Sequence, residues 1–157
     1  MRLSKHSKMI ELSFAADADV PRVLEIDRES ISPPWTLEAL QGELCREDSF
    51  FTLARIEIEI AGFCILRRMG DMGDLLKIAV DRNYRRCGVA DMLVSAALAW
   101  AAEHGLSAVF LEVRESNAAA IELYKKHGFE EARRRVRYYD TPVEDALIFI
   151  REIGGNK

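Results

Sequence analysis

The segment SAVFLEV (residues 107–113) constrains the fold most, because it is almost continuously apolar and lies between two stretches of helical periodicity. Such a run predicts a strand buried on both faces, which is typical of parallel pairing beneath helices. The preceding helical pattern covers residues 88–104 and ends at Gly105, a common helix stop. The following pattern, 118–127, starts after Asn117, a favourable helix cap. Together they predict a sheet covered by helices.

Periodicity divides the rest of the chain into further strands and helices. Strands are expected at 11–16, at 49–69 (two strands that reverse near Glu57 to Glu59), at 74–80, at 129–138 and at 144–152. A first helix is expected from a cap at Asp17 or Asp19 to the segment SISPPW, with one face formed by Val20, Val23, Leu24 and Ile26. A second helix is expected from Thr36 to about Glu47. The order β-α-α-β-β-β-α-β-α-β-β contains no repeat or linker. We expect one domain over residues 1–157, with a mixed sheet, and a flexible tail over residues 1–9.

Composition excludes several classes of protein. The chain has 157 residues, 49% of them hydrophobic and 31% charged, as in ordinary globular proteins. No apolar run approaches the roughly 20 residues that span a bilayer, and no signal peptide is evident. The net charge of −4 argues against general nucleic-acid binding. Three cysteines without CxxC spacing, and three histidines at the tail or near predicted helix ends, predict no disulfide framework and no metal site. We expect a cytoplasmic protein.

The stretch IAVDRNYRRCGVADMLV (78–94) runs from a strand through a basic turn into a helix. Backbone N–H groups at such a turn converge on one point and bind anions. Gly88 would allow close approach or supply a positive φ, and Arg85 and Arg86 would add charge-assisted contacts. The glycine pattern fits neither a Walker loop nor a dinucleotide fingerprint. The alternative is a solvated basic turn.

Glu112 interrupts the apolar strand, and burial of a carboxylate is costly unless the group is paired or used. One interpretation is an ion pair with Arg114, two residues along on the same side of the strand. The other is a general base whose pKa is raised by desolvation.

Tyr124 lies on one helical stripe with Asn117 and Ile121, so that it suits a place in the core. Alternatively, its phenol could face the cleft where Asn117 begins the helix and protonate a leaving thiolate. The small side chains of residues 118–120 would leave room for a ligand along this helix.

The segment ARRRVRYYDTPVEDAL (132–147) carries four arginines beside two tyrosines. Such a mixture can bind single-stranded nucleic acid. Regular strand alternation, however, sends Arg133, Arg135 and Arg137 to one face and Arg134, Val136 and Tyr138 to the other. A charged edge strand that discourages further pairing is the favoured interpretation.

Four segments in order carry a resemblance to a known family: SPPW (32–35), IAVDRNYRRCGVA (78–90), LEVRESNAAAIELYKKHGF (111–129) and YYDTPVEDAL (138–147). They resemble the GNAT acetyltransferase superfamily and, within it, the RimI group of ribosomal-protein N-terminal acetyltransferases. The superfamily's pyrophosphate loop (Gln or Arg, two residues, Gly, one residue, Gly or Ala) is matched by Arg85, Gly88 and Ala90. The resemblance covers nearly the whole chain. It implies the GNAT fold, with a mixed, mostly antiparallel seven-stranded sheet and helices on both faces.

The resemblance implies acetyl-CoA as the donor and direct transfer to an amine, with no metal and no acyl-enzyme. By position, Glu112 matches the general base and Tyr124, twelve residues later, the general acid. The implied cofactor-binding residues are Ile78, Ala79 and Val80 for pantetheine, then Arg85, Arg86, Cys87, Gly88, Val89, Ala90 and Asp91 around the pyrophosphate, and Asn117. Trp35, Tyr138, Tyr139, Glu144 and Asp145 are implied to frame the peptide site.

The resemblance also implies the substrate, namely the N-terminal α-amine of a protein, with the N-terminal alanine of small-subunit ribosomal protein eighteen as the expected target. An α-amine with a pKa near ~8 needs a weaker base than a lysine near ~10.4 does. The alternatives are acetylation of a lysine side chain or small amine, and a CoA-sensing or nucleic-acid-binding module without turnover. We expect a monomer or weak dimer that binds neither nucleic acid nor membranes.

Overall fold

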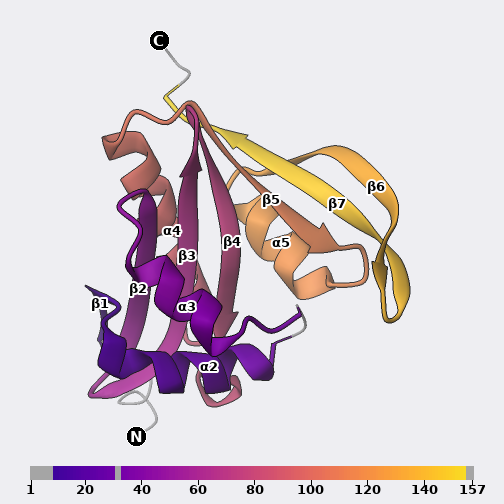
Figure 1. Cartoon of the computed structure of the whole chain (residues 1–157). Coiled ribbons are helices and arrows are strands. Elements are labelled where there is room, and N and C mark those ends of the chain that lie inside the picture. Colours follow the sequence, from indigo (N-terminus) through magenta and orange to yellow (C-terminus); the bar gives the residue numbers. More distant parts are fainter. Residues whose placement is uncertain (1–8, 31–32, 155–157) are drawn as a thin grey trace, which may run out of the picture. The chain divides into compact units, whose positions relative to one another are not determined.

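The computed structural model describes residues 9–30 and 33–154 (Figure 1). In this part of the chain, hydrogen bonds join seven strands in the order β1-β2-β3-β4-β5-β7-β6. The strands are β1 (Ile10–Phe14), β2 (Ser49–Ile56), β3 (Glu59–Met69), β4 (Met72–Val80), β5 (Ala108–Arg114), β6 (Glu130–Asp140) and β7 (Val143–Glu152). The helices are α2 (Val20–Arg28), α3 (Leu37–Leu44), α4 (Val89–Glu103) and α5 (Ala118–Lys126), with short 3-10 helices η1 (Asp17–Asp19) and η2 (Arg82–Tyr84).

The sheet is mixed. β4 pairs with β5 in parallel, whereas β1 with β2, β5 with β7 and β6 with β7 are antiparallel. The predicted element order and fold class are therefore confirmed. The chain divides into two compact units, of which the first comprises Met1–Ile65 with Lys77–Val94 and the second Leu66–Leu76 with Ser95–Lys157.

The core of the first unit lies around β2 and β3. Consecutive residues of both strands are buried, so that both faces of the sheet are covered here. Gly62 on β3 is needed for close packing, because an added Cβ would lie 2.8 Å from Ala79 O and 3.0 Å from Val89 Cγ1. The first turn of α4 thus packs directly on β3.

The helices α2 and α3 of the first unit contact each other, and α3 contacts β2 (Figure 1). The predicted helix start at Thr36 is confirmed, and Thr36 caps α3, since its Oγ1 accepts from Ala39 N at 3.1 Å. The predicted end near Glu47 was too late, because α3 stops at Leu44. The predicted reversal between β2 and β3 is confirmed, with Glu57 at a φ of 60°.

Asp19 precedes α2 but does not cap it, contrary to one of the two predicted caps. Its carboxylate instead accepts from Ala16 N at 2.9 Å and pairs with Arg55 at 2.9 Å. Leu24 was predicted on the apolar face and is only half-buried, whereas Asp27 is fully buried. The predicted tail up to residue 8 and the Ile-Ser of SISPPW lie outside the described residues.

The second unit is built around β5, β7 and the edge strand β6. Asn117 caps α5 as predicted, and Gly105 and Gly128 both have positive φ just past the ends of their helices. The β6–β7 ladder has register shifts between Glu131 and Arg133 and between Arg135 and Tyr139. Among the described residues, no helix is both long and apolar enough to cross a membrane.

The shift after Arg135 overturns the predicted alternation for the residues that follow it, whereas Arg133, Arg134 and Arg135 still occupy consecutive register positions. Arg137 has a φ of 53°, which interrupts regular alternation. The Arg135 guanidinium consequently lies over the Tyr138 ring, 5.3 Å from its centroid, although alternation would send the two side chains to opposite faces. The predicted charged edge strand is confirmed by the place of β6 at the end of the sheet.

Candidate active site

The turn between β4 and α4 has the backbone expected of an anion site. β4 ends at Val80, η2 follows, and Arg86 and Gly88 then adopt φ values of 62° and 86°. Left-handed residues alternating with extended or right-handed ones point successive N–H groups toward one side of a loop. Residues 85–88 are exposed, so these groups are open to a ligand. The predicted positive φ at Gly88 is confirmed.

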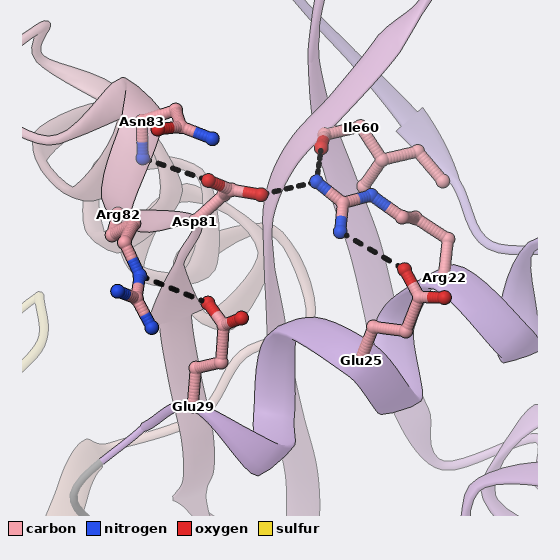
Figure 2. A network of polar contacts seen from close by, with 7 residues as sticks. All are labelled: Arg22, Glu25, Glu29, Ile60, Asp81, Arg82 and Asn83. Carbon is pink, nitrogen blue, oxygen red and sulfur yellow. Dashed lines mark hydrogen bonds and ion pairs between the residues drawn. The ribbon is translucent and has the colours of Figure 1, made fainter.

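A buried carboxylate holds the start of this turn in place. Asp81 accepts from Asn83 N at 2.7 Å and from the Arg22 guanidinium of α2, which also donates to Ile60 O at 3.4 Å (Figure 2). Burial opposes ionisation of Asp81, but the hydrogen bonds from Asn83 and Arg22 outweigh it and lower the pKa of the carboxyl. The turn is therefore tied to both α2 and β3.

Two more exposed ion pairs border this network. Arg22 contacts Glu25 at 3.2 Å, and Arg82 of η2 contacts Glu29 at 3.5 Å (Figure 2). Nothing in the local sequence pattern predicted that α2 would support the turn at residues 85–88 (the Arg-Gly turn), because Arg22 and Asp81 are about sixty residues apart.

A second buried pair joins α2 to β4, directly before the residues of β4 that are predicted to pair with pantetheine. Lys77 Nζ lies 2.7 Å from Asp27 Oδ1, and the two side chains are 3% and 0% exposed. Lys77 also donates to Pro33 O at 3.1 Å, and Asp27 accepts from Trp35 N at 2.6 Å. The half-buried Trp35 is thus anchored beside β4. A lysine within the apolar run LLKIAV was the one available signal.

In the second unit, Glu112 differs from its predicted environment. The residue is exposed, because the pattern of β5 buries its neighbours Leu111 and Val113 but not Glu112 itself. The expected desolvation of a buried base is therefore wrong. The expected pair with Arg114 is wrong as well, since Glu112 Oε2 lies 3.7 Å from Arg135 on β6, whereas Arg114 contacts Glu144 at 3.3 Å.

Tyr138 lies beside Glu112. The negative charge of Glu112 and a hydrogen bond to it raise the pKa of the Tyr138 phenol, which favours the phenol as donor to the carboxylate. Tyr138 and Tyr139 meet edge to face with centroids 5.1 Å apart. Arg114 lies over the Tyr139 ring at 4.1 Å. Both tyrosines were predicted to frame the peptide, and the charge of Glu112 acts on each of them.

Asp74 is a further acid that the sequence reasoning missed. It lies on β4 opposite Phe110 of β5. Burial, with a smaller contribution from the charge of Glu112, raises the pKa of Asp74 to about 6, although Arg67 opposes this.

Glu144 and Asp145, also predicted at the peptide site, support the loops around it. Glu144 accepts from Ser116 N and Oγ at 3.0 Å each, and these bonds, with Arg114, lower the pKa of its carboxyl. Asp145 accepts from Arg137 N at 2.9 Å and pairs with Arg134 at 2.7 Å, which lowers its pKa. Glu144 therefore holds the β5–α5 connection, and Asp145 holds the irregular part of β6 around Arg137.

Asn117 and Tyr124 belong to α5. Asn117 Oδ1 accepts from Ala120 N at 3.2 Å, so that its oxygen serves the helix cap. Tyr124 is 6% exposed and packs edge-on against Phe129, with centroids 5.6 Å apart. The interpretation of Tyr124 as a core residue is confirmed, and its role as general acid stays a prediction. No group of three His, Cys, Asp or Glu residues placed to hold a metal occurs within residues 9–30 and 33–154.

Comparison with known proteins decides the family. The model of the acetyltransferase (GNAT) family matches residues 20–129, which include the Arg-Gly turn, Glu112 and Tyr124. The chain belongs to the GNAT acetyltransferase family. It is accordingly an acetyl-CoA-dependent N-acetyltransferase, and the resemblance read from its motifs is confirmed.

Relatives place this GNAT enzyme more narrowly. The ribosomal protein bS18 alanine N-acetyltransferase of Salmonella typhimurium is 33% identical over 143 residues, 89% of this chain and 95% of that protein. The crystal structure of the ribosomal protein S18 alanine N-acetyltransferase of Escherichia coli matches with a TM-score of 0.85 and 31% identity, covering 95% and 99% of the two chains. Ard1 of Thermoplasma volcanium matches with a TM-score of 0.82 and 27% identity, covering 92% and 97%. The chain is thus RimI-like.

Proposed function

We propose that this GNAT enzyme acetylates the N-terminal α-amine of a protein, and that its target is the N-terminal alanine of ribosomal protein bS18. The observation that carries the proposal is the 33% identity to the bS18 alanine N-acetyltransferase over 95% of that enzyme. Recognition of a protein N-terminus needs residues that bind the peptide as well as a loop that binds the cofactor, and the similarity covers 89% of this chain, so that it is not confined to the cofactor loop.

The donor would be held at the Arg-Gly turn. The N–H groups of residues 86–91, beside the exposed Arg85 and Arg86, suit a pyrophosphate, and the backbone of Ile78, Ala79 and Val80 suits the amides of pantetheine. A thioester supplies an acetyl group that is already activated, so alignment with the amine provides much of the acceleration. The chain's own residues then need to manage only protons.

Glu112 and Tyr124 are the residues we propose for this task. Glu112 is exposed enough to meet an incoming amine and accepts one proton from the α-ammonium. The nitrogen then bonds to the carbonyl carbon, the carbon–sulfur bond breaks, and the sulfur takes a proton from the Tyr124 phenol. The second proton lost by nitrogen restores Tyr124, so that one proton is released overall.

Glu112→Gln tests the base. We expect kcat on an alanine-starting bS18 peptide to fall about a hundredfold, because general base catalysis contributes roughly 10²–10⁴. Acetyl-CoA affinity by calorimetry should stay unchanged. Glu115→Gln is the matched control, since Glu115 is also exposed and pairs with an arginine, Arg134, at 3.0 Å. Unchanged turnover of the Glu112 variant would remove it as base.

The acceptor is tested separately. The wild-type enzyme should release CoA with the alanine-starting peptide, but not with an N-terminally blocked lysine peptide or with polyamines. Release with either of the latter would support the lysine or small-amine alternative, and none with any acceptor would support a module without turnover. Mass spectrometry of protein N-termini from cells with and without this chain would identify the physiological target. The cytoplasmic location, the monomeric or weakly dimeric state and the absence of nucleic-acid or membrane binding stay predictions.

A further inference from the structure

Asp74 shares a face of the sheet with Glu112. In the parallel ladder Asp74 lies opposite Phe110, and Glu112 follows Phe110 by two residues, so that the side chains of Asp74 and Glu112 point to the same side. Apart from the buried Ala108, the residues of β4 and β5 on this side are half-buried or exposed, whereas the alternate residues of both strands are buried. Two carboxylates therefore stand as diagonal neighbours on an accessible surface.

The charged groups around Asp74 come from three other strands. Glu112 of β5 repels the Asp74 carboxylate, and Arg67 of β3 attracts it. The charges of both carboxylates raise the pKa of Tyr138 on β6. Arg135 of β6 lies 3.7 Å from Glu112 and is partly exposed. Burial, with a smaller contribution from the charge of Glu112, raises the pKa of Asp74 to about 6, so that Asp74 ionises at neutral pH only at some electrostatic cost.

We infer that Asp74 is a second binding residue for the acceptor amine, which together with Glu112 holds the positively charged α-ammonium of the incoming protein. The inference rests on the proposed role of Glu112. A compact ammonium with three N–H donors can contact two carboxylates at once and relieve the repulsion between them. One proton then passes from nitrogen to the carboxylate pair, with no other bond changed, and leaves a neutral amine free to react.

The same arrangement would separate substrate from product. The acetylated N-terminus carries no charge, so that it loses the contact to both carboxylates once the acetyl group has been transferred. Asp74 should therefore contribute to the binding of the free terminus and not to that of the acetylated one. A merely structural residue would affect both alike.

Calorimetry on the enzyme saturated with CoA tests this inference. The ligands are an alanine-starting bS18 peptide and the same peptide with an acetylated N-terminus. For Asp74→Asn we expect roughly tenfold weaker binding of the free peptide, the loss of about one charge-assisted contact, and unchanged binding of the acetylated peptide. Asp74→Glu retains the charge and should retain most of the preference. Asp71→Asn, an exposed acid in the preceding turn, is the control for net charge.

Equal loss for both peptides, or no loss for either, would overturn the inference. A titration of the wild type at pH 5 provides a second readout, because protonation of Asp74 should reduce the preference for the free peptide toward that of the Asn variant. Turnover distinguishes the two proposals. If the wild type acetylates the peptide and Asp74→Asn binds it normally, only the inference fails, whereas no acetylation by the wild type overturns the proposed function and the inference with it.

Discussion

The Lys77–Asp27 pair is the contact whose loss we expect to destabilise the first unit most. The two atoms lie 2.7 Å apart, and both side chains are almost fully buried. Lys77→Met removes the ammonium and keeps a long apolar stem, so that the change leaves a carboxylate in the interior without its counter-charge. The bond from Lys77 to Pro33 O is lost as well.

The magnitude follows from what remains around Asp27. Breaking a buried ion pair by removing one partner costs about 3–5 kcal/mol. Asp27 keeps the bond from Trp35 N at 2.6 Å and a long one from Ser30 Oγ at 3.5 Å, and these donors offset part of the lost charge. We therefore expect a loss of about 3 kcal/mol, at the lower end of that range. With a urea m-value of about 2 kcal/mol/M, the midpoint should fall by about 1.5 M.

The assay is urea unfolding at pH 7 followed by circular dichroism, in low and in high salt. Arg46→Met is the matched control, because Arg46 lies 2.8 Å from Asp48 but the side chains are 43% and 38% exposed. Exposed pairs contribute little, so this variant should unfold like the wild type. The Lys77→Met effect should persist in high salt, since buried pairs are screened weakly. Equal midpoints for the two variants would refute the reasoning that burial decides the cost.

Three further changes give expected outcomes. Tyr124→Phe keeps the packing on Phe129, so that the melting temperature should stay close to that of the wild type while kcat falls about a hundredfold. Full activity of this variant would exclude Tyr124 as the general acid. Gly88→Ala places a Cβ on a residue with a φ of 86°, which costs about 1 kcal/mol of backbone strain, so that the Kd for acetyl-CoA should rise about fivefold. Gly70→Ala, at a φ of 66° in another turn, is the control and should leave this Kd unchanged. Asp74→Asn should stabilise the protein only above pH 4. The folded-state pKa of Asp74 is raised from 3.8 to about 6. The stability that this group gives the wild type is therefore present at low pH and is lost as pH rises through 6. After allowance for partial exposure, the free energy of unfolding of the variant should exceed that of the wild type by about 1–2 kcal/mol at pH 7. A constant difference from pH 3 to 8 in thermal unfolding would contradict that assignment.

Features that depend on neighbouring residues were predictable from the sequence. Thr36 was expected to start a helix and Asn117 to cap one, and the side chains of both accept the hydrogen bonds typical of caps. Gly88 was expected to supply a positive φ, and does so. Caps, turns and periodicity involve interactions within about four residues, so that the local chain contains most of the information they need.

Features that depend on pairing between distant segments were not predictable. The contact of Glu112 with Arg135 joins residues of β5 and β6, and the register shift after Arg135 arises in the pairing of β6 with β7. Alternation predicted the arginines on two fixed faces, because it assumes a regular strand. The sequence pattern could not show where regularity would break.

The sequence by itself determined the order of strands and helices, the positive φ at Gly88 in the turn before α4, and the family, because each is encoded in local periodicity or in contiguous motifs. Only the tertiary structure decided which charges are buried together and which acids share a face. Asp27 meets Lys77 fifty residues along the chain, and Asp74 meets Glu112 across a parallel ladder. The physical reason is that the energy of a charge depends on its burial and its partners in space, and both are set by the packing of elements that are distant in sequence.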